Sequence, residues 1–164
     1  MAKKIPGKEE FHETLRYFQR QIELLKVHVH LNTTAEVNRL SDFDHVILAT
    51  GVVPRVWSIP GSNRENVLSY VDVLHGEKPV GKNVAIIGAG GIGFDVAEYL
   101  LHDEHVGFYE EWGIDQKMER RGGVMEPIHG NPKRNIHMLQ RSEGKVGGNL
   151  GKTTGWIHRS ALKK

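Results

Sequence analysis

The chain has 164 residues, a length that suits one domain or parts of two. Hydrophobic residues make up 38% and glycines number 19, which is typical of a loop-rich nucleotide-binding fold or of a segment of a larger protein. The formal net charge is only +2, and Lys and Arg are interspersed among 20 acidic residues, which argues against a nucleic-acid partner.

The absence of cysteine and of long apolar segments excludes several further classes of site. It contains no cysteine, which excludes disulfides, thiolate zinc sites, cysteinyl iron–sulfur ligation and a cysteine nucleophile within these residues. The opening from Met1 to Glu10 has no apolar core of a signal peptide. No apolar run approaches the roughly 18 residues of a membrane span. We therefore expect a cytoplasmic protein without a membrane partner.

The N-terminal part predicts one helix and two strands. Apolar residues recur at three- and four-residue steps from Phe11 to Leu25, which predicts a helix. Residues 27–31 alternate with period two and predict a strand. The continuous apolar run 46–49 predicts a strand buried on both faces. Prolines and glycines then interrupt regular structure and place a boundary near residue 65.

The rest of the chain alternates strands and helices. The predicted elements are a short helix over 67–74, a buried strand over 84–87, a helix over 92–101, a strand over 136–139 and a helix from residue 156. Residues 103–134 have no clear period and are interpreted as an insertion. This order predicts an α/β fold, a Rossmann-like parallel sheet with helices on both faces, incomplete within this chain.

The strongest motif is a G-x-G-x-x-G between the strand over 84–87 and the helix that follows it. Its residues are Gly88, Ala89, Gly90, Gly91, Ile92 and Gly93. In this context the first glycine allows a tight turn, the second lets the backbone approach a diphosphate, and the third lets the helix pack on the strand. The helix N-terminus presents unpaired amides to the phosphates. The motif predicts dinucleotide binding; the alternative is a glycine turn without a ligand.

The choice of nucleotide is usually decided at the end of the next strand. Glu110 and Glu111 lie near the usual offset, but no buried strand precedes them. The strand over 136–139 leads instead to Arg141 and Ser142, where a guanidinium and a hydroxyl suit a 2′-phosphate. This favours NADP over NAD. Glu143 keeps NAD open, and Arg141 as a plain surface charge is the alternative.

Other candidate motifs give weaker evidence for a functional site. The segment 149–153 lacks the first glycine of a P-loop, since Val146 occupies that position. The histidine pairs His28/His30 and His102/His105 each offer two ligands with no third, so no metal site is predicted. We assign no catalytic residue, because hydride transfer belongs to the cofactors and the protein orients them.

Six stretches resemble the bacterial NADPH-dependent 2,4-dienoyl-CoA reductases, within the old yellow enzyme-like flavoproteins that carry two nucleotide-binding domains. They are AKKIPGKEEFHETLR (2–16), FDHVILATGVVP (43–54), VLSYVDVL (67–74), PVGKNVAIIGAGGIGFDVA (79–97), EWGID (111–115) and LGKTTGWIHR (150–159). The resemblance covers most of the chain outside 103–134 and corresponds to a C-terminal segment of that family.

The resemblance implies a parent protein with an FMN-bearing barrel, an iron–sulfur cluster, an FAD domain and an NADPH domain. There NADPH reduces FAD, electrons cross the cluster to FMN, and a dienoyl thioester of fatty acid β-oxidation is reduced. Residues 1–65 would be a remnant of the FAD domain with its crossover. Residues 66–164 would be an NADP(H)-binding Rossmann domain truncated at its C-terminus.

Site residues also follow from the resemblance. The glycines of the turn match the NADPH diphosphate site, Arg141 falls at the 2′-phosphate contact, and Thr50 and Gly51 match a segment that passes close to FAD. The chain has no barrel, cysteines or FAD glycine fingerprint. FAD, FMN and the cluster are therefore expected only in the full-length parent, whose missing flavin and barrel domains are the expected partners. A non-catalytic dinucleotide-binding module and an inactive truncated chain are the alternatives.

Overall fold

The computed structural model describes residues 1–163, which fall into two compact units. The first unit combines Met1–Phe11 with the segment that begins at Arg64, and the second is His12–Asn63. None of the helices within residues 1–163 is long and apolar enough to cross a lipid bilayer.

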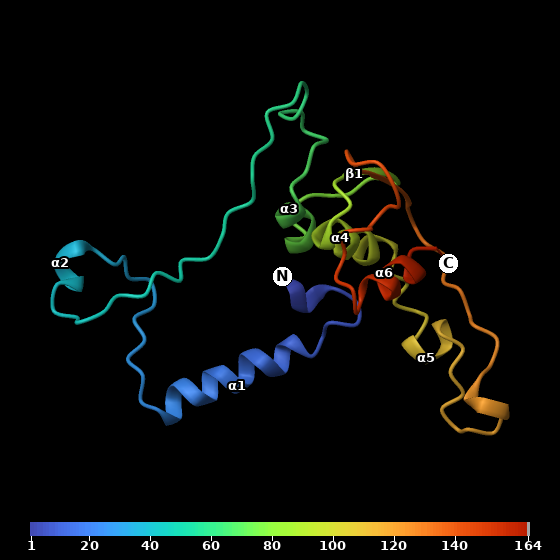
Figure 1. The fold of residues 1–164 in the computed structure, drawn as a ribbon, viewed down its shortest axis with the longest axis horizontal. Helices are drawn as coiled ribbons and strands as arrows, with labels where there is room; N and C mark the ends of the chain where they lie inside the picture. Colours follow the sequence, from blue (N-terminus) through green and yellow to red (C-terminus); the bar gives the residue numbers. More distant parts are fainter. Residues whose placement is uncertain (164) are drawn as a thin grey trace. The chain divides into compact units, whose positions relative to one another are not determined.

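The first unit is built on a parallel pair of strands, β1 (Asn83–Ile87) and β2 (Asn135–Leu139). Their register pairs Asn83 with Asn135 and Ile87 with Leu139, so both strands leave the sheet at the same edge. Helix α4 (Gly91–Leu101) follows β1 directly, and α6 (Gly155–Ala161) follows the loop after β2 (Figure 1). The predicted α/β fold with a parallel sheet and surrounding helices is confirmed.

The core lies between α4, the short helix α3 (Tyr70–His75) and the N-terminal segment. The turn η1 (Ala2–Lys4) brings Ile5 into this core, where it is 1% exposed. Helix α3 begins at a capping box, in which the Ser69 hydroxyl accepts from the Asp72 amide and the Asp72 carboxylate accepts from the Ser69 amide. The buried members of the core are Ile5, Val73, Leu74, Val96 and Leu100.

The strands are less buried than the sequence predicts. Side chains along β1 and β2 alternate between half-buried and exposed positions. Val84, Ile86 and Ile136 pack against the core, whereas Ile87 and Leu139 remain exposed. With two strands, this sheet buries only one side of each strand, and the expectation of a fully buried strand over 84–87 is wrong.

The segment interpreted as an insertion contains short elements of its own. These are α5 (Phe108–Glu111), η2 (Arg121–Gly123) and an isolated antiparallel bridge between Ile114 and Val124. The bridge closes a loop in which the Met125 amide donates to the Gly113 carbonyl oxygen at 2.8 Å. None of these residues adds a strand to the β1–β2 sheet in the described part of the chain.

Two strands predicted for the N-terminal part do not form. Helix α1 (Phe11–Leu24) is present as predicted, and a short α2 (Val37–Leu40) follows it, but residues 27–31 and 46–49 are irregular. Ile47 and Leu48 are 88% and 82% exposed, the opposite of the burial expected. A strand needs a neighbour to satisfy its backbone groups. The described residues of the second unit contain no strand that could serve as one.

Candidate dinucleotide-binding site

The glycine turn begins where β1 ends. The Gly88 amide donates to the Leu139 carbonyl oxygen at 2.8 Å, which holds the start of the turn against the end of β2. Gly88 has φ +116°, a conformation that residues with a side chain rarely adopt. This residue therefore lets the chain turn sharply out of the sheet and into α4.

Gly93 allows α4 to pack closely on this turn. A Cβ atom added to Gly93 would collide with the Gly88 carbonyl oxygen and contact the Met138 side chain. The missing side chain is therefore what allows the first turn of the helix to sit against the end of the sheet. This arrangement corresponds to the packing role that the third glycine has in dinucleotide-binding turns.

The middle of the turn faces open space. Cβ atoms added to Gly90 or Gly91 would meet no protein atom within 4 Å. Gly90 is the N-cap of α4, and the first helical hydrogen bond runs from the Phe94 amide to the Gly90 carbonyl oxygen. The preceding amides lie ahead of that bond at the positive end of an 11-residue helix. Bare main chain, amide donors and a positive dipole end together fit a diphosphate.

Arg141 and Ser142 lie at this same edge of the sheet. They follow β2, whose last residue pairs with the last residue of β1. The Gln140 side-chain amide donates to the Ser142 and Gly144 carbonyl oxygens at 2.9 and 3.3 Å and shapes the loop. Both candidate side chains are exposed, and within residues 1–163 no hydrogen bond or ion pair engages the Arg141 guanidinium. The fold thus brings the residues predicted to bind the diphosphate and those predicted to bind the 2′-phosphate to the same edge of the sheet.

Thr50 and Gly51 are the residues predicted to pass close to FAD. They lie in the second unit, in an irregular exposed segment where the strand expected over 46–49 is missing. Gly51 has φ +78°, and a Cβ atom there would meet no protein atom within 4 Å. The place of Thr50 and Gly51 beside FAD therefore stays a prediction.

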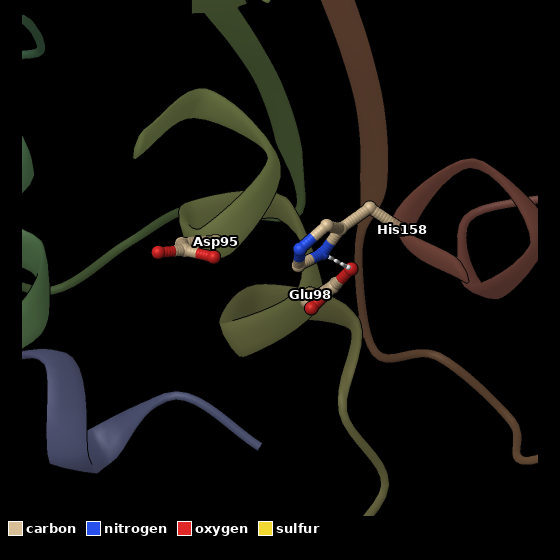
Figure 2. Close-up of side chains that lie close together, drawn as sticks. All are labelled: Asp95, Glu98 and His158. Atoms are coloured by element: carbon tan, nitrogen blue, oxygen red, sulfur yellow. Dashed lines mark hydrogen bonds and ion pairs between the residues drawn. The ribbon is translucent and has the colours of Figure 1, made fainter. Parts of the chain in front are cut away.

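A polar cluster that sequence reasoning missed ties α4 to two distant segments. Figure 2 shows three of its side chains, Asp95, Glu98 and His158. The Lys8 ammonium lies 2.5 Å from an Asp95 carboxylate oxygen, and His158 Nδ1 lies 2.7 Å from Glu98 Oε1. All four side chains are largely or partly buried. Asp95 and Glu98 are three residues apart on α4, so the spacing was visible in the sequence, but their partners are 87 and 60 residues away.

The same cluster has ligand types that metals use. One ligand atom from each of Asp95, Glu98 and His158 lies within 4.8 Å of the others. The Lys8 ammonium already supplies a positive charge to Asp95, and Glu98 is already bonded to His158. We interpret the cluster as a tie that fixes α4, and with it the orientation of the glycine turn.

Glu98 makes this tie sensitive to pH. Burial raises the pKa of its carboxyl above the ordinary value of 4.5, and the His158 hydrogen bond and charge, with Lys8, oppose that rise while Asp95 adds to it. The folded state therefore binds a proton more tightly than the unfolded state. Its contribution to stability is fully present below pH 4.5 and is lost as pH rises through the raised pKa.

Glu98→Gln removes this dependence and keeps an acceptor for His158. We expect the free energy of unfolding of the wild type to fall relative to that of the variant as pH rises from below 4.5 to neutrality, by about 1.4 kcal/mol for each unit of raised pKa. Urea denaturation at a series of pH values measures the difference. A wild-type minus variant difference in the free energy of unfolding that stays constant with pH, or that increases toward neutrality, would contradict the assignment.

A family model describes most of this architecture. The model for pyridine nucleotide-disulphide oxidoreductases matches residues 6–119, which include β1, the glycine turn and all of α4. The chain belongs to this family. Pyridine nucleotide-disulphide oxidoreductases bind FAD and a nicotinamide dinucleotide, so a redox role is established at the level of the family. Arg141 and Ser142 lie beyond the matched residues.

Two proteins with similar sequences are reductases that are much longer than this chain. The chain is 35% identical over 103 residues to a cinnamate reductase from Clostridium sporogenes, covering 58% of the chain and 15% of the relative. It is 26% identical over 170 aligned residues to a metal reductase from Desulforamulus reducens, covering 97% of the chain and 25% of the relative. The chain thus spans a quarter or less of the length of these two relatives.

A solved structure shares the fold over nearly the whole chain. A 2-naphthoyl-CoA reductase in complex with 2-naphthoyl-CoA matches 99% of the chain with a TM-score of 0.70, at 21% identity and over 20% of its own length. The names of these proteins differ in substrate. Membership of the pyridine nucleotide-disulphide oxidoreductases therefore indicates a redox role, but it does not identify the substrate.

Proposed function

We propose that this chain is the NADP(H)-binding segment of a flavin-dependent reductase that resembles the 2,4-dienoyl-CoA reductases. The observation that carries the proposal is the common edge of the sheet, where the open turn at Gly90 and the exposed Arg141 follow two strands in register. The turn would hold the diphosphate, and Arg141 with Ser142 would hold the 2′-phosphate.

The flavin side of the reaction belongs to a longer polypeptide in this proposal. When bound, NADPH supplies a hydride that FAD accepts, leaving NADP⁺ and reduced flavin. The segment 1–65 would complete an FAD domain only with residues outside this chain, and the barrel, FMN and iron–sulfur cluster would also lie there. The small share of each relative that the chain spans supports this division.

Binding without flavin chemistry is the second candidate function. It is favoured by the irregular segment around Thr50 and Gly51, which offers no strand to carry a flavin in the described residues. The visible absorption spectrum tests this alternative on the chain, purified from cells and after incubation with FAD, and on the longer polypeptide of which it would be a segment. Flavin retained by either one would exclude a module without flavin chemistry. A colourless chain that binds NADPH is expected from both candidates, so the spectrum of the longer polypeptide then separates them.

Titration calorimetry of the 164-residue chain with NADPH and with NADH tests the nucleotide assignment. Loss of a charge-assisted contact is worth about 1.5–3 kcal/mol. We therefore expect Arg141→Ala to weaken NADPH binding by at least about tenfold and to leave NADH binding nearly unchanged. Arg39→Ala, at an arginine of the second unit, is the matched control and should change neither affinity. Equal affinity of the wild type for both nucleotides would refute the role of Arg141.

A further inference from the structure

A cavity of about 430 Å³ lies at the opposite edge of the sheet from the glycine turn. Its lining includes Pro79 and Val80, which precede β1, and Lys133 and Arg134, which precede β2. The glycine turn follows the other ends of these strands. Five strand residues at about 3.3 Å each put the two places roughly 16 Å apart. A ligand in this cavity would therefore occupy a site separate from the dinucleotide site.

The lining of this cavity is strongly cationic. Four of its side chains are positively charged and one is an acid; the cations are Lys4, Lys78, Lys133 and Arg134, and the acid is Glu104. The Lys4 ammonium donates to the Leu74 carbonyl oxygen at 2.8 Å, and the Arg134 guanidinium donates to the Leu100 carbonyl oxygen at 3.2 Å. Carbonyl acceptors are neutral, so these two bonds orient the cations and leave their charge in place.

Two carboxylates stand near the other two cations. Asp72 lies 3.8 Å from Lys78, and the charge of Lys133 contributes to the lowered pKa of Asp103 after the backbone hydrogen bonds that Asp103 accepts. Asp72 accepts from the amide and hydroxyl of Ser69, and Asp103 accepts from two backbone amides. Both acids are thus held by caps and turns outside the lining, and the cavity keeps an excess of positive charge.

Apolar side chains complete the walls. Val73 and Leu100 are buried, and Tyr99 and Val80 are half-buried and pack against the core cluster. Four cations from three separate segments lie beside an apolar wall, an arrangement that suits a ligand with a multiply charged oxyanion and an apolar or ring portion. We propose that this cavity binds a small organic phosphate, whose phosphate faces Lys78, Lys133 and Arg134.

Residue-resolved NMR of the isotopically labelled chain tests the site with inorganic phosphate and phenyl phosphate as probes. We expect phenyl phosphate to shift the amide signals of Lys78, Val80, Lys133 and Arg134 and to bind more tightly than inorganic phosphate. Shifts confined to Gly88–Gly93 would overturn the proposal, because they would place the phosphate on the dinucleotide turn. Equal affinity for inorganic phosphate and phenyl phosphate would contradict the inference that the ligand has an apolar organic portion.

The double variant Lys78→Gln with Lys133→Gln provides a second test of the proposed phosphate site. Neither side chain donates to a backbone carbonyl within residues 1–163, so the fold should be kept, as the melting temperature will report. We expect phenyl phosphate binding to weaken at least about tenfold while NADPH affinity stays unchanged. The matched control, Lys26→Gln with Lys117→Gln, removes two charges elsewhere and should bind normally. Unchanged binding in the first variant, or an equal loss in the control, would overturn the proposal.

Discussion

Replacing Gly90 by valine is expected to abolish nucleotide binding while the protein stays folded. The backbone at Gly90 has φ −89° and ψ −174°, which a valine adopts without strain, and its Cβ would meet no protein atom within 4 Å. The added side chain would instead occupy the space into which the diphosphate must fit. We expect NADPH affinity to fall by about 100-fold, or about 2.7 kcal/mol.

Gly90→Val should lower the free energy of unfolding by about 1 kcal/mol, since valine is a poorer N-cap than glycine. Calorimetry with NADPH and thermal unfolding by circular dichroism measure the two effects separately. Gly81→Val is the matched control, because it adds the same side chain at an open position outside the turn and should bind NADPH normally. Wild-type affinity in Gly90→Val would show that no phosphate approaches this turn.

Gly93→Val is expected to impair both folding and binding. Its Cβ would collide with the Gly88 carbonyl oxygen, so α4 would have to move away from the end of β1. Forcing extra atoms into a packed site costs about 1–3 kcal/mol, and here the obstacle is main chain that has little freedom to yield. We expect a lower free energy of unfolding in urea and loss of NADPH binding together.

The contrast between the two variants separates packing from ligand contact. Gly93→Ala already carries the colliding atom and should be destabilised in the same direction as Gly93→Val, whereas Gly90→Val should not. Hydrogen exchange of the α4 amides provides an independent measurement, with faster exchange expected only in the Gly93 variants. Normal stability in Gly93→Ala would mean that the helix and turn are not held as closely as the structure indicates.

Much of the first unit was predictable from local signals. The apolar run before the glycines, the glycine motif and the apolar face after it specify β1, the turn and α4 within some 20 consecutive residues. The positive φ at Gly88 and the close contact at Gly93 are requirements that only glycine meets. The glycine positions in the sequence therefore predicted the geometry of the turn. The position of Arg141 after β2 followed from the same strand-by-strand argument.

Other features depend on partners far away in the chain. The runs 27–31 and 46–49 have the apolar pattern of strands, yet they remain irregular because backbone hydrogen bonds must come from a neighbouring strand. No periodicity over a short window reports whether that neighbour exists. The pairing of Lys8 with Asp95 and of His158 with Glu98 likewise joins residues that no local pattern connects.

By itself, the sequence determined the type of most elements in the first unit and the residues of the glycine turn, because those properties depend on neighbours within a few positions. Only the tertiary structure decided that β1 and β2 end in register, that a polar tie holds α4, and that four cations converge on one cavity. These features involve residues up to 129 positions apart in the sequence, such as Lys4 and Lys133 in the lining of one cavity, and packing alone brings such residues together.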